Sequence, residues 1–105
     1  MPLDILAGLS HDAPIYDGDF ADPTALAAGS TLYFYASSSQ PSRYDHGANL
    51  PVIALSRGDG FSGRFVGDAM PTVPTWSVSG YQWGPDVWAR PDGTYVLYYL
   101  SLIHI

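Results

Sequence analysis

Two aspartates, each beside a proline and close to an aromatic residue, are the side chains in this sequence best suited to acid–base chemistry. They occur in the motifs Phe20-Ala21-Asp22-Pro23 and Trp83-Gly84-Pro85-Asp86-Val87. An ionised carboxylate can take a proton from water, and a second carboxylate nearby can raise the pKa of an acid. An Asp beside a Pro also simply caps turns or begins strands. The pair therefore points to a site only if the fold brings both carboxylates together.

The residues that follow the two aspartates repeat a common pattern. A short stretch, a Gly-Ser turn and an aromatic run beginning at Thr31 follow Asp22, while a Pro-Asp-Gly turn and an aromatic run beginning at Thr94 follow Asp86. The copies lie roughly 63 residues apart, a spacing typical of repeated structural units. We expect each Asp to open a strand in the same register, which would direct both carboxylates to one place.

Short runs of aromatic and β-branched residues, punctuated by Gly, Pro, Ser and Asp, predict an all-β fold. The expected strands are 25–28, 31–36, 50–56 and 64–69, with a loop at 40–49, and then a second hairpin from 87–90 and 94–99. Four successive antiparallel strands are the content of one β-propeller blade. Residues 19–75 would then be a first blade and 76–101 the start of a second, with 102–105 interpreted as foreign to the fold.

In a propeller the innermost strand of each blade lines the central channel. Strands opened by Asp22 and by Asp86 would therefore place the two carboxylates in one axial pocket. Closure needs at least four blades, because a blade cannot bury its faces alone. The sequence is accordingly expected to be the N-terminal part of a longer propeller.

The two motifs, with the Asn49-Leu50-Pro51-Val52 strand and the Asp68-Ala69-Met70-Pro71 segment between them, resemble glycoside hydrolase family 43. The resemblance runs from about residue 19 to 99, with Gly84 in a place where the family usually has Ala. It implies a five-bladed propeller that hydrolyses arabinan, xylan or related glycosides. Asp22 would be the general base, and Asp86 would tune and orient the general acid.

The family's general acid is a Glu on the third blade, and this sequence contains no Glu. The resemblance implies inversion of configuration, in which a base activates water while an acid about 6.5–9.5 Å away protonates the leaving oxygen. This chain would thus hold an incomplete centre and be inactive alone. Phe20, Trp76 and Trp83 are candidates for stacking on sugar rings, and Trp83 is the favoured one, although core packing is the commoner role of such rings.

Two rival functions remain open. The chain could belong to a carbohydrate-binding propeller without catalysis, or to an interaction propeller in which both aspartates are structural. A Glu on a third blade would favour the enzyme over these alternatives.

Composition excludes several other classes. The formal charge of −6 argues against nucleic acid, and no apolar run reaches the roughly 18–20 residues that span a bilayer. The sequence has no Cys for a disulfide, a thiolate metal site or a nucleophile. No cofactor and no metal ligand is expected, although a central ion such as calcium in a complete propeller stays open. The expected partner is an oligo- or polysaccharide, while the compartment and oligomeric state stay undetermined.

Overall fold

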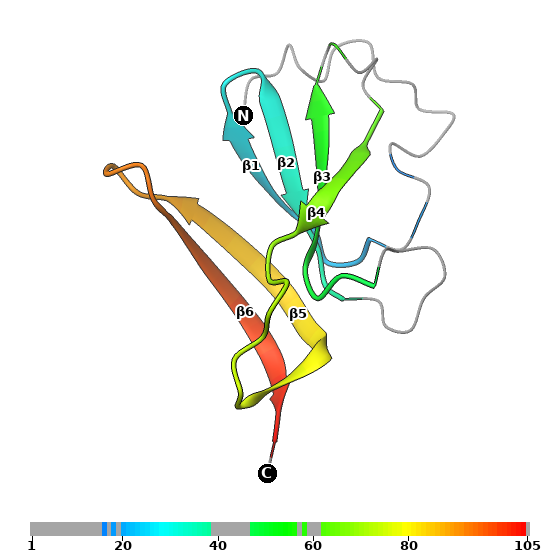
Figure 1. Cartoon of the computed structure of the whole chain (residues 1–105). Coiled ribbons are helices and arrows are strands. Elements are labelled where there is room, and N and C mark those ends of the chain that lie inside the picture. The colour runs from blue at the N-terminus through cyan, green and yellow to red at the C-terminus, as the bar shows by residue number, and fades with distance from the viewer. Residues whose placement is uncertain are drawn as a thin grey trace.

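The computed structural model describes residues 16, 18, 20–38, 47–56, 58 and 62–104. Within these ranges the chain forms six strands: β1 (Thr24–Ala28), β2 (Thr31–Tyr35), β3 (Pro51–Ser56), β4 (Arg64–Asp68), β5 (Ser77–Ala89) and β6 (Tyr95–Ile103). The first four make one antiparallel sheet in sequence order, and β5 and β6 make a separate hairpin (Figure 1). The predicted all-β class is confirmed for the described residues.

The four-stranded sheet is a simple meander. Its first turn places Gly29 at a positive φ of 62°, a conformation that costs little for glycine, and this turn joins β1 to β2 in the register Ala28 to Thr31. The predicted strands 25–28, 31–36, 50–56 and 64–69 are confirmed to within about one residue. Most of the predicted loop at 40–49 lies outside the described residues, which resume at Gly47.

One face of this sheet carries the hydrophobic core. Leu32 on β2 lies opposite Leu55 on β3, both side chains are fully buried, and Phe34 packs against them. Phe20 extends this apolar layer, because its ring meets Tyr16 edge to face at 5.7 Å and lines a pocket with Phe34. Alternation along β2 sends Tyr33 and Tyr35 to the opposite face, toward the hairpin.

The β5–β6 hairpin projects away from the sheet (Figure 1). A short strand opening at Asp86 was expected, and this expectation is wrong: β5 begins at Ser77 and Asp86 lies well inside it. Gly80 and Gly84 have positive φ angles of 85° and 56°, and the β5–β6 register shifts on either side of the Gln82–Trp83 pair. These irregularities let a strand continue through residues that usually end one.

The β6 strand continues through Leu102 and Ile103. Ile103 pairs with Ser77, and the His104 amide donates to the Trp76 carbonyl at 3.1 Å. At this end of the hairpin the Gln82 side-chain amide donates to Ser77 Oγ at 2.9 Å and to Ser101 Oγ at 3.2 Å. Buried polar contacts therefore fix the register near the end of β6.

Candidate functional site

The Asp22 and Asp86 motifs lie side by side, and a single serine connects them. Ser37, two residues after the end of β2, donates its hydroxyl hydrogen to Asp22 Oδ2 at 3.1 Å and accepts the Gly84 amide at 2.9 Å. Its own amide donates to the Ala21 carbonyl at 3.0 Å. Ser37 is buried, so these bonds are protected from competing water. One side chain thus fixes the position of both motifs.

The next residue extends this connection along β5. The Ser38 amide donates to the Gln82 carbonyl at 2.8 Å, and the Ser38 hydroxyl donates to the Gly80 carbonyl at 2.6 Å. The Gln82 amide in turn donates to Ser38 Oγ at 3.2 Å. The segment after β2 is therefore bound to the early part of β5, which also pairs with β6 at Ser77 and Gln82.

Asn49 makes a second, independent joint between the sheet and the hairpin. Its buried side-chain carbonyl accepts the Gly80 amide at 2.8 Å and the Ser79 hydroxyl at 3.0 Å, while its NH₂ group donates to the Met70 carbonyl at 2.7 Å. The neighbouring Asp68 carboxylate accepts the backbone amides of Asn49, Leu50 and Met70 at 2.8–2.9 Å. Asp68 therefore has a structural role, because its carboxylate fixes the conformation of this loop.

The Asp86 carboxylate is exposed and held on both oxygens. Thr24 at the start of β1 donates to Oδ1 at 3.3 Å, and the Trp88 indole donates from Nε1 to Oδ2 at 2.9 Å. The first bond joins β1 directly to β5. Thr24 on β1 thus contacts the second motif directly, although Asp86 does not begin its strand.

Asp22 is exposed and lies just before β1. Among the non-glycine residues that the structure describes, it alone has a positive φ, 52°. Asp is among the few residues that tolerate this left-handed conformation. The conformation turns the chain sharply, so that Ala21 pairs with Ser37 while β1 begins at Thr24. Both carboxylates therefore reach solvent from neighbouring segments, an arrangement in which an anionic base could meet a water molecule.

The three predicted sugar-stacking residues lie in three different places. Trp83 is 38% exposed, meets Tyr81 edge to face at 6.1 Å, and pairs with Leu100 on the face of the hairpin that also carries Asp86. Trp76 stacks on Tyr99 at 6.5 Å beside the far end of the hairpin. Phe20 belongs to the apolar layer over the sheet. Only Trp83 shares a face with a predicted carboxylate.

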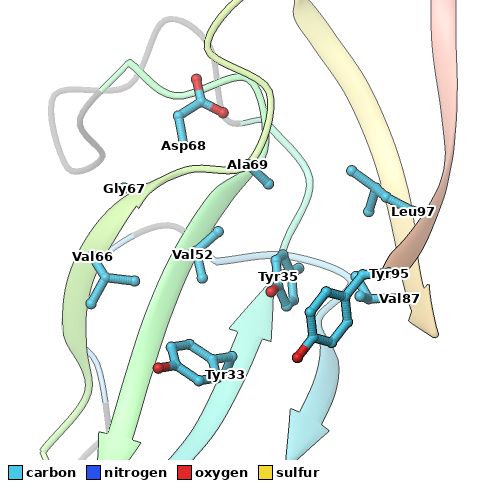
Figure 2. Close-up of a pocket in the computed structure, with 10 residues that line it drawn as sticks. All are labelled: Tyr33, Tyr35, Val52, Val66, Gly67, Asp68, Ala69, Val87, Tyr95 and Leu97. Carbon is cyan, nitrogen blue, oxygen red and sulfur yellow. The ribbon is translucent and has the colours of Figure 1, made fainter. Parts of the chain in front are cut away.

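A groove of about 410 Å³ separates the sheet from the hairpin (Figure 2). Tyr33, Tyr35 and Val52 line it from the sheet, and Tyr95 and Leu97 line it from β6. Burial raises the pKa of Tyr35, and the negative charges of ionised Tyr33 and Tyr95 would raise it further. Val87 also faces this groove, so its neighbour Asp86 points to the opposite face of the hairpin.

Sequence reasoning missed four residues of the site: Ser37, Ser38, Thr24 and Trp88. Ser37 and Ser38 carry no local signal for these contacts, because their partners on β5 lie more than forty positions away in the chain. The alternation Asp86-Val87-Trp88 did carry a signal for Trp88, since residues two apart in a strand share a face.

No group of three or more His, Cys, Asp or Glu side chains is placed to hold a metal ion within the described ranges. The same ranges contain no helix long and apolar enough to cross a membrane. No protein-family model matches the sequence, and neither a curated protein nor a solved structure matches it.

Proposed function

We propose that this chain supplies the general base and the acid-orienting carboxylate of an inverting glycosidase that acts on arabinan or arabinose-decorated xylan. Asp22 takes the proton from the attacking water, and Asp86 raises the pKa of the acid that protonates the leaving oxygen. In the family that the two motifs resemble the acid is a Glu, and these 105 residues contain none, so the proposal requires an acid from a longer polypeptide. The chain alone is therefore catalytically incomplete.

The observation that carries the proposal is the Ser37 contact. Its hydroxyl touches the Asp22 carboxylate and the Gly84 amide, so the two sequence motifs meet although they lie about sixty residues apart. The shared hydroxyl holds the two motifs at neighbouring positions, as a single active centre requires. Both carboxylates are exposed, as a base that must reach water and sugar requires.

The proposed architecture is a five-bladed propeller. The four-stranded antiparallel meander has the strand order of one blade, and β5–β6 has the form of the first hairpin of the next. The Thr24–Asp86 bond lies where the first strands of the two units approach each other. A central channel formed by further blades would enclose these carboxylates.

Hydrolysis by the longer polypeptide that joins this chain to a third-blade Glu tests the catalytic role. Asp22→Asn is expected to lower kcat on arabino-oligosaccharides by about 10²–10⁴-fold, the usual contribution of a general base. The matched variant Asp68→Asn removes a carboxylate of structural function. It is expected to lower the melting temperature and to leave kcat largely unchanged. NMR of the first product formed reports the anomeric configuration. Retention of configuration, or near-complete activity in Asp22→Asn, would contradict the proposal.

A non-catalytic carbohydrate-binding role is the second candidate, favoured by the exposed edge-to-face pair of Tyr81 and Trp83. In that case the longer polypeptide binds arabino-oligosaccharides without turnover, and Asp22→Asn leaves the affinity unchanged. Trp83→Ala would weaken binding in a calorimetric titration, while Trp76→Ala, at the other end of the hairpin, would not. Turnover that depends on Asp22 rejects this second candidate.

A further inference from the structure

The Asp86 carboxylate receives hydrogen bonds from side chains on two different strands. Trp88 on β5 donates from Nε1 to Oδ2 at 2.9 Å, and Thr24 on β1 donates from Oγ1 to Oδ1 at 3.3 Å. Both contacts lie at the surface. The terminal torsion of an Asp side chain is broad, so an exposed carboxylate keeps one orientation only when fixed donors hold it. These two donors supply such a restraint.

The contact of Trp88 follows from the geometry of β5. Side chains two residues apart in a strand stand on the same face, so the indole lies beside Asp86 while Val87, between them, lines the groove. An indole N–H can donate a hydrogen bond but cannot accept one, so it pairs with the acceptor oxygens of a carboxylate. Hydrogen bonds to an ionised acceptor are stronger than those between neutral groups. Trp88 is therefore the stronger of the two donors.

The three Trp residues differ in what they contact. Trp76 and Trp83 each lie against a tyrosine ring, at centroid distances of 6.5 and 6.1 Å. Trp88 is the most exposed of the three, at 61%, and its indole N–H is bonded to Asp86. Burial of the Trp88 ring therefore contributes little to stability. The bond to the candidate carboxylate is what distinguishes this residue from the other two.

We propose that Trp88 is a positioning residue of the candidate active centre, which holds the Asp86 carboxylate in its orientation toward the general acid, with Thr24 as a weaker second support. This inference rests on the glycosidase function proposed above. A carboxylate has about four acceptor positions on its two oxygens, and the two donors take one position on each. The remaining positions stay available to the acid that a longer polypeptide would supply.

The role of Trp88 predicts an effect that depends on the leaving group. In the proposed mechanism Asp86 acts on the reaction only through the general acid. A sugar hydroxyl is a poor leaving group and needs protonation by that acid, whereas dinitrophenolate leaves without it. A loss of the Asp86 orientation should therefore slow the hydrolysis of oligosaccharides and spare that of an activated aryl glycoside. A general loss of folding would slow both reactions equally.

The hydrogen bond itself can be tested by NMR on this chain. The sequence contains three Trp, so the proton–nitrogen spectrum holds three indole N–H signals. Asp86→Ala removes the acceptor, which should move the Trp88 signal upfield and speed its exchange with solvent. The signal of Trp76, at the far end of the hairpin, should keep its position and exchange rate. An unchanged Trp88 signal, or equal changes of the two signals, would overturn the proposal.

Kinetics of the longer polypeptide test the positioning role. Trp88→Phe keeps an aromatic ring and removes the N–H donor. It should lower kcat on arabino-oligosaccharides about tenfold, a part of the about 10²–10⁴-fold that a positioned acid contributes, with KM unchanged. On a dinitrophenyl arabinoside kcat should stay within about twofold, because no protonation is needed. The matched control Trp76→Phe should alter neither reaction. Equal losses on both substrates, or no loss on either, would overturn the proposal.

Failure of this inference differs from failure of the glycosidase function. A longer polypeptide without turnover that depends on Asp22 rejects the function, and the role of Trp88 with it. Turnover that depends on Asp22 but is unaffected by Trp88→Phe leaves the function standing and rejects the positioning role. Thr24→Val removes the second donor and should reproduce the effect of Trp88→Phe more weakly. Thr24→Ser keeps the hydroxyl and should behave as the unaltered protein.

Discussion

Buried hydrophobic residues and exposed aromatic residues are distributed unevenly between the four-stranded sheet and the β5–β6 hairpin. The sheet and its flanking loops hold nearly all of the buried hydrophobic residues, whereas Val87 is the hairpin's contribution to that set. The hairpin instead carries the exposed aromatic rings and Asp86. The sheet can thus sustain itself by burial, while the hairpin is positioned by polar contacts from Ser37, Ser38 and Asn49. The hydrophobic core therefore belongs to the sheet, whereas the candidate site draws Asp22 from the segment that leads into the sheet and Asp86 from the hairpin.

The largest expected effect is a loss of stability when the hydrophobic core of the four-stranded sheet is truncated. Leu55→Ala removes a fully buried side chain that packs on Leu32, which should lower the free energy of unfolding by about 2–5 kcal/mol. Urea unfolding followed by circular dichroism measures it. Val66→Ala truncates a side chain that is 41% exposed and serves as the control. Similar losses from the two variants would show that the sheet lacks the distinct core described.

A smaller loss of stability is expected to affect the hairpin and not the sheet. Asn49→Ala leaves the Gly80 amide without its acceptor in a buried setting, which costs about 1–3 kcal/mol. Hydrogen exchange should accelerate at β5 amides while β2 and β3 keep their protection. Ser79→Ala removes one donor to the Asn49 side chain and keeps the bond from the Gly80 amide, so it should loosen β5 less. Uniform acceleration across both regions would mean that sheet and hairpin open as one unit.

The smallest effect concerns the turn of the hairpin. The Thr94 hydroxyl and amide donate to Asp92 Oδ1 at 2.6 and 3.0 Å and lower the pKa of Asp92 below its ordinary value. A lowered pKa stabilises the fold above the unfolded-state pKa, and this stabilisation is lost as pH falls through the folded-state pKa. Thr94→Ala should move the Asp92 pKa back up in an NMR titration, and Thr94→Ser should not. An unchanged pKa in Thr94→Ala would assign the shift to another cause.

The sequence predicted the local elements well and the long-range contacts poorly. Strands β2 to β4 follow from short aromatic and β-branched runs between turn residues, and β1 from its place before the Gly-Ser turn; these signals are local. The start of β5 could not be predicted in the same way. Gly80, Gly84 and Pro85 are residues that normally interrupt strands, and Ser77–Gln82 is held in place by β6, Ser38 and Asn49, all distant in the chain.

The candidate site shows the same division. The repeated Asp pattern indicated that Asp22 and Asp86 belong together, and their segments do meet. The assumed reason, that each opens a strand in equal register, was wrong for Asp86. The contacts come instead from the hydroxyls of Ser37 and Thr24, whose side chains have no sequence signature because serine and threonine are common beside turns.

The left-handed backbone at Asp22 limits which amino acids this position can hold. A φ of 52° costs most side chains about 1–2 kcal/mol, whereas Gly, Asn and Asp adopt it readily. Among those three, only Asp carries a charge, so Asp is the one residue that combines this backbone conformation with a carboxylate. The Asp22→Asn replacement consequently changes charge while sparing the backbone, and Ala or Leu would combine both losses. The backbone conformation alone thus restricts this position largely to Gly, Asn and Asp.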